Sequence, residues 1–257
     1  MDEKESQEAT GIAFGMPHSD TGDWNVGPVT IEGEVGEFIR MRIRSGELRA
    51  GDRLPPQREL ASILGVARPT LRQALKTLEI QGYVSTTRGA AGGTKVAALK
   101  REHHWLPEDR KNLSELDSQF EFRIAIERST ARLACAKRLD QHLDEMELAI
   151  EAMLAGGENT AELRHADARF HLTLAIATRN PRLVDALRAI RSELFLPSES
   201  NKSLSGSARA AAEHRVVLEH VRNRNPDAAE LAMQEHIEAI WQLYRNALLS
   251  GEVTEGK

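Results

Sequence analysis

The sequence predicts a mostly α-helical protein in two parts, three helices with a β-hairpin and then an all-helical bundle. Apolar residues recur at spacings of three and four over most of the chain, Gly and Pro separate these stretches, and a Gly-rich segment at 83–99 is β-prone. Aromatic residues make up 4% of the chain, which favours helical Leu/Ala packing over a β-sandwich. The 257 residues exceed the roughly 100–150 of a typical domain, so we expect two domains.

Three helices are expected in the first part. Residues 1–27 are acidic and rich in Gly, Ser and Asp, and we expect a tail without regular structure. Apolar residues at helical spacing predict a helix over about 29–46, which "RAGDRLPP" ends. The segment "PQRELASILG" then predicts a short helix closed by Gly65, and "ARPTLRQALKTLEIQG" predicts a third, with Pro69 in its first turn.

A hairpin and a charged linker are expected next. The segment "YVSTTRGAAGGTKVAAL" places β-prone residues around a glycine-rich centre, as in a β-hairpin. The first domain is therefore predicted at 28–98 and the linker at 99–112.

Residues 113–250 predict a helical bundle, followed by a short tail at 251–257. Asn followed by Pro opens two of the helices, in "NPRL" and "NPDAAEL", and "GGEN", "LPSES" and "GSA" supply further breaks. The expected helices cover residues 113–138, 140–155, 160–178, 181–196, 206–223 and 226–249.

Composition excludes several classes of protein. No apolar run approaches the ~20 residues that span a bilayer, and the acidic N-terminus lacks the features of a signal peptide, so we expect a cytoplasmic protein. Cys135 is the only cysteine and lies in an Ala/Leu-rich stretch, which indicates packing rather than a disulfide or a thiolate metal site. Residues 31–97 hold eleven Lys/Arg against seven Asp/Glu, whereas the rest holds twenty-three against thirty-two. This small surplus matters only if the basic residues share a face that meets phosphates.

The third predicted helix has the residues of a DNA reader. Leu71, Leu75 and Leu78 form one inward stripe, and Arg68 and Arg72 lie off it, one turn apart, near the N-terminal end. In that position an arginine fork can pair with guanine in the major groove. Taken singly, each arginine is better explained as an exposed residue that keeps a surface helix solvated, as most exposed arginines do; the order of the surrounding elements favours DNA contact.

The order of these features resembles the winged helix-turn-helix of the GntR family of bacterial transcription regulators. The matching residues are Leu54-Pro55, Arg58-Glu59-Leu60-Ala61, Leu64-Gly65-Val66, Arg68, Leu71-Arg72, Ala74-Leu75 and Gly82. The resemblance implies contacts to double-stranded operator DNA from Arg58, Arg68, Thr70, Arg72, Arg88 and Gly89. Ala67 replaces a frequent small hydroxyl residue, Gln57 replaces a frequent Glu, and "GAAGG" lengthens the wing, which puts single contacts in doubt.

One carboxylate and three histidines are predicted to face the interior of the bundle. Asp167 and His171 are four residues apart and so share a helix face, and His214 and His236 are each in register with an apolar stripe. Together they could bind a divalent transition metal and leave positions open for water or a ligand. The alternative is that each histidine is a separate core or surface residue with its own hydrogen-bond partner.

The second part of the chain is similar to the ligand-binding domain of the FadR branch of GntR regulators. Its metal-binding members carry D-x-x-x-H, then "EH", then a His after "M-x-x", which correspond here to Asp167 with His171, His214 and His236. The resemblance also makes Arg123 a candidate to bind an effector carboxylate; a surface pair with Glu127 is the alternative. Zn is favoured as the metal, and Ni and Mn suit the same ligands.

These expectations define one function and two rivals. The leading prediction is a homodimeric, ligand-responsive transcriptional repressor, not an enzyme, that senses a small organic acid through a metal-containing pocket. The first rival is a metal-dependent hydrolase or oxygenase fused to a DNA-binding module, which would need a general base such as Glu213 beside the metal. The second, a structural scaffold, leaves the face of Arg68 and Arg72 unexplained.

Overall fold

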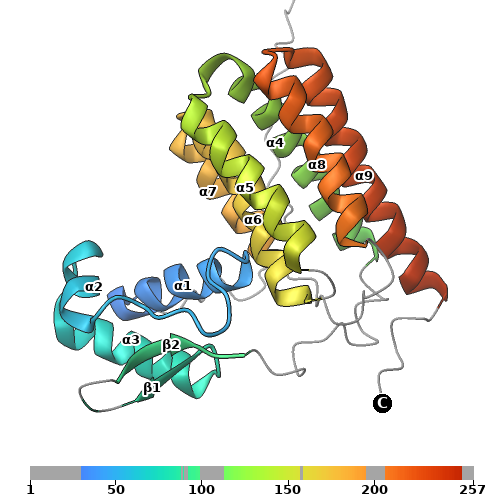
Figure 1. Cartoon of the computed structure of the whole chain (residues 1–257). Coiled ribbons are helices and arrows are strands. Elements are labelled where there is room, and N and C mark those ends of the chain that lie inside the picture. Colours follow the sequence, from blue (N-terminus) through green and yellow to red (C-terminus); the bar gives the residue numbers. More distant parts are fainter. Residues whose placement is uncertain are drawn as a thin grey trace, which may run out of the picture. The chain divides into compact units, whose positions relative to one another are not determined.

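The computed structural model describes residues 30–87, 89, 92–98, 113–156, 159–194 and 206–250 (Figure 1). The expected tails at 1–27 and 251–257 and the expected linker at 99–112 lie outside these residues. None of the described helices combines the length and the apolar character that a membrane-spanning segment needs.

The first part of the chain contains the expected three helices and hairpin. They are α1 (Ile31–Arg44), α2 (Gln57–Ile63), α3 (Arg68–Ile80), β1 (Val84–Thr87) and β2 (Gly93–Val96). The two strands are antiparallel, and Val84 pairs with Val96. The predicted winged helix-turn-helix order of elements is therefore present.

One hydrophobic core holds these elements together. Leu71, Leu75 and Leu78 of α3 are at most 2% exposed, and they belong to the same buried cluster as Ile39 of α1 and Val84 of β1. Burying such side chains stabilises a fold by about 1.5–3 kcal/mol each. The inward stripe predicted from the spacing of these leucines is confirmed.

Gly82 turns the chain from α3 into the hairpin. Its φ is +78°, a left-handed backbone conformation that glycine adopts readily and residues with a Cβ rarely adopt. The amide of Tyr83 donates to the carbonyl of Leu78, and the amide of Gly82 donates to that of Glu79. These bonds close the helix and lead a buried Tyr83 into β1.

The second part of the chain is a bundle of helices. They are α4 (Leu113–Lys137), α5 (Asp140–Gly156), α6 (Thr160–Ala177), α7 (Pro181–Glu193), α8 (Ser207–Arg222) and α9 (Pro226–Ser250). Helix α4 packs along α9, α5 packs against α6 and α8, and α8 packs against α9 (Figure 1). These bounds agree with the predicted helices to within three residues.

Asparagine side chains begin two of the bundle helices. Asn159 Oδ1 accepts hydrogen bonds from the amides of Ala161 and Glu162 at the start of α6. Asn180 caps α7 in the same way, and Pro181 follows in the first turn. The second of these helix starts is the "NPRL" signal found in the sequence.

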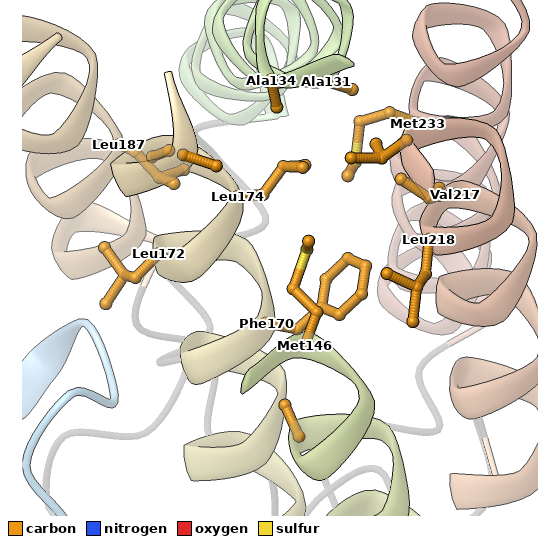
Figure 2. Close-up of a cluster of buried hydrophobic side chains, with 14 of the residues drawn as sticks. Ala131, Ala134, Met146, Phe170, Leu172, Leu174, Leu187, Val217, Leu218 and Met233 are labelled. Carbon is orange, nitrogen blue, oxygen red and sulfur yellow. The ribbon is translucent and has the colours of Figure 1, made fainter. Parts of the chain in front are cut away.

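The bundle encloses its own hydrophobic core. Figure 2 shows Phe170 of α6 close to Met146 of α5 and Leu218 of α8, and all three side chains are fully buried. Cys135 is also buried, at 2% exposure, and its thiol lies 3.4 Å from the carbonyl oxygen of Ala131. The expectation that Cys135 is a packing residue is confirmed by this burial.

Candidate functional site

Two arginines of α3 lie outside the hydrophobic core of the first domain. Arg68 and Arg72 are exposed, whereas Leu71 and Leu75 beside them are buried. Residues four apart lie on one face of a helix, so the two guanidinium groups share an exposed face in the N-terminal half of α3. A helix with such a face can enter the major groove of DNA.

The other predicted DNA contacts lie on neighbouring elements. Arg58 is exposed at the start of α2, and Thr70 is half-buried on α3. Gly89 is exposed between the two strands with a φ of +108°, which leaves its backbone accessible. Arg88 lies outside the described residues.

Four side chains from three bundle helices converge on one point. Asp167 and His171 come from α6, His214 from α8 and His236 from α9, and one nitrogen or oxygen atom of each lies within 4.8 Å of the others. The three imidazoles are at most 2% exposed. The inward direction predicted for these histidines is present in the structure.

The spacing of these atoms suits a metal ion. His171 Nε2 lies 3.0 Å from His214 Nε2, and Asp167 Oδ1 lies 3.5 Å and 3.4 Å from these two nitrogens. Ligand atoms about 2.1 Å from one ion are about 3.0 Å apart at right angles and about 3.4 Å apart in a tetrahedron. His236 Nε2 is buried and has no hydrogen-bond partner among the described residues, as expected of a nitrogen that a metal would occupy.

The other nitrogen of each imidazole faces an acceptor. His214 Nδ1 lies 2.6 Å from the carbonyl oxygen of Ala210, and His236 Nδ1 lies 2.8 Å from Glu213 Oε2. His171 Nδ1 contacts Glu127 Oε2 of α4. Each ring is therefore held at Nδ1, and its Nε2 is directed to the point where the three rings converge.

The carboxylates of half-buried Asp167 and buried Glu127 are kept ionised by nearby charged groups. Burial raises the pKa of Asp167, but Arg191 and the imidazoles lower it more, so it lies well below the usual range. Burial likewise raises the pKa of Glu127, and His171, Arg123 and Arg191 lower it more. Ionised carboxylates are the form that binds a metal or accepts a hydrogen bond from a ring N–H.

The three imidazoles differ from one another electrostatically. Burial lowers the pKa of His214 and of His236, which favours the neutral rings that bind metals. Burial also lowers the pKa of His171, but the charges of Glu127 and Asp167 raise it more, so its net shift is upward. His171 is thus the ring most strongly stabilised by negative charge.

Two buried arginines bind carboxylates of the site, Arg191 that of Asp167 and Arg123 that of Glu127. Arg191 of α7 is 8% exposed and donates to Asp167 Oδ2 at 2.7 Å, while its Nε is buried without a partner among the described residues. Arg123 of α4 is 6% exposed, and its Nε donates to Glu127 Oε1 at 2.7 Å. The Arg123–Glu127 pair considered from the sequence is therefore present, but it is buried and not at the surface.

Three polar residues of this site were not predicted as such. Glu127 was considered only as a surface partner, and Glu213 only as a general base. Arg191 lies in "RAIRSEL", and nothing in that segment distinguishes it from an arginine at the protein surface. The pairs Arg123–Glu127 and Arg209–Glu213, each four residues apart, are a signal that could have drawn attention to both glutamates.

Comparison with known families assigns both parts of the chain. Residues 31–96 match the family described as "Bacterial regulatory proteins, gntR family". Residues 118–239 match the family described as "FCD domain". The first match contains α1 to β2, and the second contains the four converging residues.

Individual proteins give the same assignment. The chain is 34% identical over 212 residues to the HTH-type transcriptional regulator RmpR of Mycobacterium gastri, covering 79% of this chain and 76% of that protein. It is 30% identical over 230 residues to an L-lactate dehydrogenase operon regulatory protein of Escherichia coli K12, covering 82% and 84%. The solved structure of E. coli McbR/YncC has the same fold, with a TM-score of 0.51, 18% identity and coverage of 85% and 99%. The chain therefore belongs to the GntR family of bacterial transcriptional regulators, and its second part is an FCD effector domain.

Proposed function

We propose that this regulator is an operator-binding repressor that senses a small carboxylate through a divalent metal in its FCD domain. The DNA-binding domain spans about 28–98, the linker 99–112 and the sensing domain 113–250. The observation that carries the proposal is the convergence of Asp167, His171, His214 and His236 inside the bundle.

The DNA contacts are proposed on the exposed face of α3 and its neighbours. Arg68 and Arg72 would read base edges, and Arg58 and Thr70 would bind phosphates. Arg88 and Gly89 of the hairpin would contact the minor groove or the backbone. One such domain contacts few base pairs, so we propose a homodimer that binds two half-sites, in the cytoplasm where the operator lies.

The metal is proposed to be Zn, and Ni or Mn would suit the same donors. When bound, it would supply a positive charge with open ligand positions, to which a carboxylate oxygen can bind. The four proposed ligand side chains come from α6, α8 and α9, so a bound ion would link these three helices. Binding in a site that exists only in the folded chain stabilises the fold.

The effector is proposed to be a small organic acid. Two buried guanidinium groups belong to the site: Arg191 binds the proposed donor Asp167, and Arg123 binds Glu127, which in turn contacts His171. Arg123 uses its Nε on Glu127, so the rest of its fork is proposed to bind a carboxylate of the effector. The similarity to a regulator of an L-lactate dehydrogenase operon supports this class of ligand.

Effector binding would be linked to DNA binding through the position of the bundle helices. A ligand shifts an equilibrium between two arrangements only by its difference in affinity for them. We propose that the effector favours one arrangement of α4, α6, α8 and α9, and that this arrangement sets the spacing of the two DNA-binding domains in the dimer.

The enzyme alternative receives little support from the site. A metal-dependent hydrolase needs a general base that is free to take a proton from water. Both carboxylate oxygens of Glu213 already accept hydrogen bonds, Oε1 from Arg209 and Oε2 from His236. A turnover assay with metal and a panel of organic acids tests this alternative, and regulation without turnover is expected.

The proposed function is tested with DNA selected by the purified protein from a random-sequence library. Fluorescence anisotropy then measures the affinity for that DNA while small carboxylates are added to zinc-loaded and to zinc-free protein. A carboxylate that changes the affinity only in the zinc-loaded form supports the proposal. If a carboxylate changes the DNA affinity equally in the zinc-loaded and the zinc-free protein, the metal takes no part in sensing.

A further inference from the structure

Two Arg-x-x-x-Glu pairs on different helices make similar contacts around the site. On α4, Arg123 Nε donates to Glu127 Oε1 at 2.7 Å, and Glu127 Oε2 contacts His171 Nδ1 of α6. On α8, Arg209 Nε donates to Glu213 Oε1 at 2.7 Å, and Glu213 Oε2 lies 2.8 Å from His236 Nδ1 of α9. In both pairs one carboxylate oxygen binds the arginine of its own helix and the other binds a histidine of another helix.

The hydrogen bonds at Nδ1 determine which nitrogen carries the proton in the neutral rings of His236 and His214. A carboxylate accepts hydrogen bonds, so a neutral imidazole that binds it must donate from Nδ1. The carbonyl of Ala210 imposes the same tautomer on His214. Nε2 of His214 and Nε2 of His236 are then each left with a lone pair, and His214 Nε2 lies 3.0 Å from His171 Nε2. An imidazole nitrogen with a lone pair is the form that binds a metal ion.

We propose that Glu127 and Glu213 are positioning residues of the metal site, each held by its arginine: Glu213 fixes His236 as the Nδ1–H tautomer, and Glu127 orients His171 through its close contact with Nδ1. The proposal rests on the proposed metal site and adds the residues that set its affinity. Partners that orient metal-binding histidines typically change metal affinity about 10–100-fold when they are removed.

The two glutamates differ in environment, which decides the choice of variants. Glu127 is 1% exposed, so an apolar replacement would leave Arg123 buried without its partner. The side chain of Glu213 is 27% exposed and its arginine lies at the surface, so we expect the fold to tolerate a replacement there. Glu213→Leu is therefore the main test, and Glu127→Gln, which keeps an acceptor oxygen, is the second.

A matched control is available on α8. Glu219 is exposed and binds Arg222, but no contact joins it to an imidazole in the described part of the chain. Glu219→Gln removes a carboxylate from the same helix without touching the site. Glu213→Gln is the conservative variant, because its amide oxygen can still accept from Nδ1 of His236.

The first measurement is the zinc dissociation constant of the full chain, obtained by competition with a chromophoric chelator. We expect about 10–100-fold weaker binding for Glu213→Leu, a smaller loss for Glu213→Gln and for Glu127→Gln, and no change for Glu219→Gln. Wild-type affinity in Glu213→Leu would overturn the proposal.

The second measurement is the tautomer of His236 in the metal-stripped full chain, from long-range ¹H–¹⁵N correlation spectra of the imidazoles. The Nδ1–H form is expected in the wild type and in Glu213→Gln, and its loss is expected in Glu213→Leu. An unchanged tautomer in Glu213→Leu would overturn the positioning role. If the wild type binds no divalent metal, the proposed metal site fails, whereas these spectra still decide whether Glu213 positions His236.

Discussion

Replacing His214 with Ala should abolish stabilisation by zinc without unfolding the protein. His214 Nε2 lies 3.0 Å from His171 Nε2 and 3.4 Å from Asp167 Oδ1, so it is central among the proposed ligands. Loss of a residue that only orients a ligand costs about 10–100-fold in metal affinity, and loss of the ligand itself should cost at least about 100-fold.

The expected size of the effect follows from mass action. Free zinc at about 100 times the dissociation constant stabilises the folded state by about 2.7 kcal/mol. For a chain of this size, about 1 kcal/mol changes Tm by about 2–4 °C, so the wild-type Tm should rise by about 5–11 °C. After a 100-fold loss of affinity, the same zinc concentration stabilises by only about 0.4 kcal/mol, or about 1 °C.

The assay is thermal unfolding with and without zinc, followed by circular dichroism. His220→Ala on the same helix is the control, because His220 is half-buried and is not one of the four converging residues. It should retain the full zinc-dependent rise in Tm. An equal rise in His214→Ala would refute the assignment of His214 as a ligand, and folded zinc-free His214→Ala should still bind DNA.

Three further changes test other parts of the structure. Arg72→Ala should weaken binding to the selected DNA by about 1–3 kcal/mol if Arg72 reads a base, with little change in binding to random DNA. Equal losses of binding free energy on both DNAs, or a similar loss in the control Lys76→Ala, would indicate a phosphate contact. Leu71→Ala should lower the free energy of unfolding by about 2–5 kcal/mol in urea titrations, because Leu71 is fully buried, and a change below about 1 kcal/mol would contradict its place in the core. Asn180→Ala should lower the free energy of unfolding by about 1 kcal/mol, because the Asn180 side chain accepts a hydrogen bond from the amide of Arg182 at the start of α7. Asn180→Asp keeps the acceptor oxygen and should lower the free energy of unfolding by less.

Much of the fold could be predicted because its signals are local. The stripe of Leu71, Leu75 and Leu78 and the Asn-Pro helix start at Asn180 depend on residues only a few positions apart. The end of α7 was less accurate, since it was expected at residue 196 and lies at Glu193. Helix ends depend on hydrogen bonds that several different residues can satisfy.

The histidines of the site could be predicted for the same local reason, and their supporting residues could not. The register of His214 and His236 with apolar residues of their helices was enough to predict that both side chains point inward, and both are buried. Glu213 directly precedes His214 and therefore points about 100° away from it around the helix, and nothing in the sequence indicated that its carboxylate would contact His236 of the neighbouring helix. Such contacts depend on how helices pack against one another, which the spacing within a single helix does not specify.

Buried charge was the other feature that periodicity missed. Arg123 and Glu127 are four residues apart, as in many exposed helix pairs, and both are buried because that face of α4 lies inside the bundle. Arg191 is buried because it binds Asp167. Each charge is tolerated by its partner, and the partners come together only in the folded chain.

Native mass spectrometry of the full chain, incubated with zinc and exchanged into volatile buffer, tests the central claim most directly. The account predicts a dimer that carries one zinc ion per chain, and a metal-free mass for His214→Ala treated in the same way. A wild-type protein that emerges without metal, or a His214→Ala variant that carries the same zinc as the wild type, would contradict it.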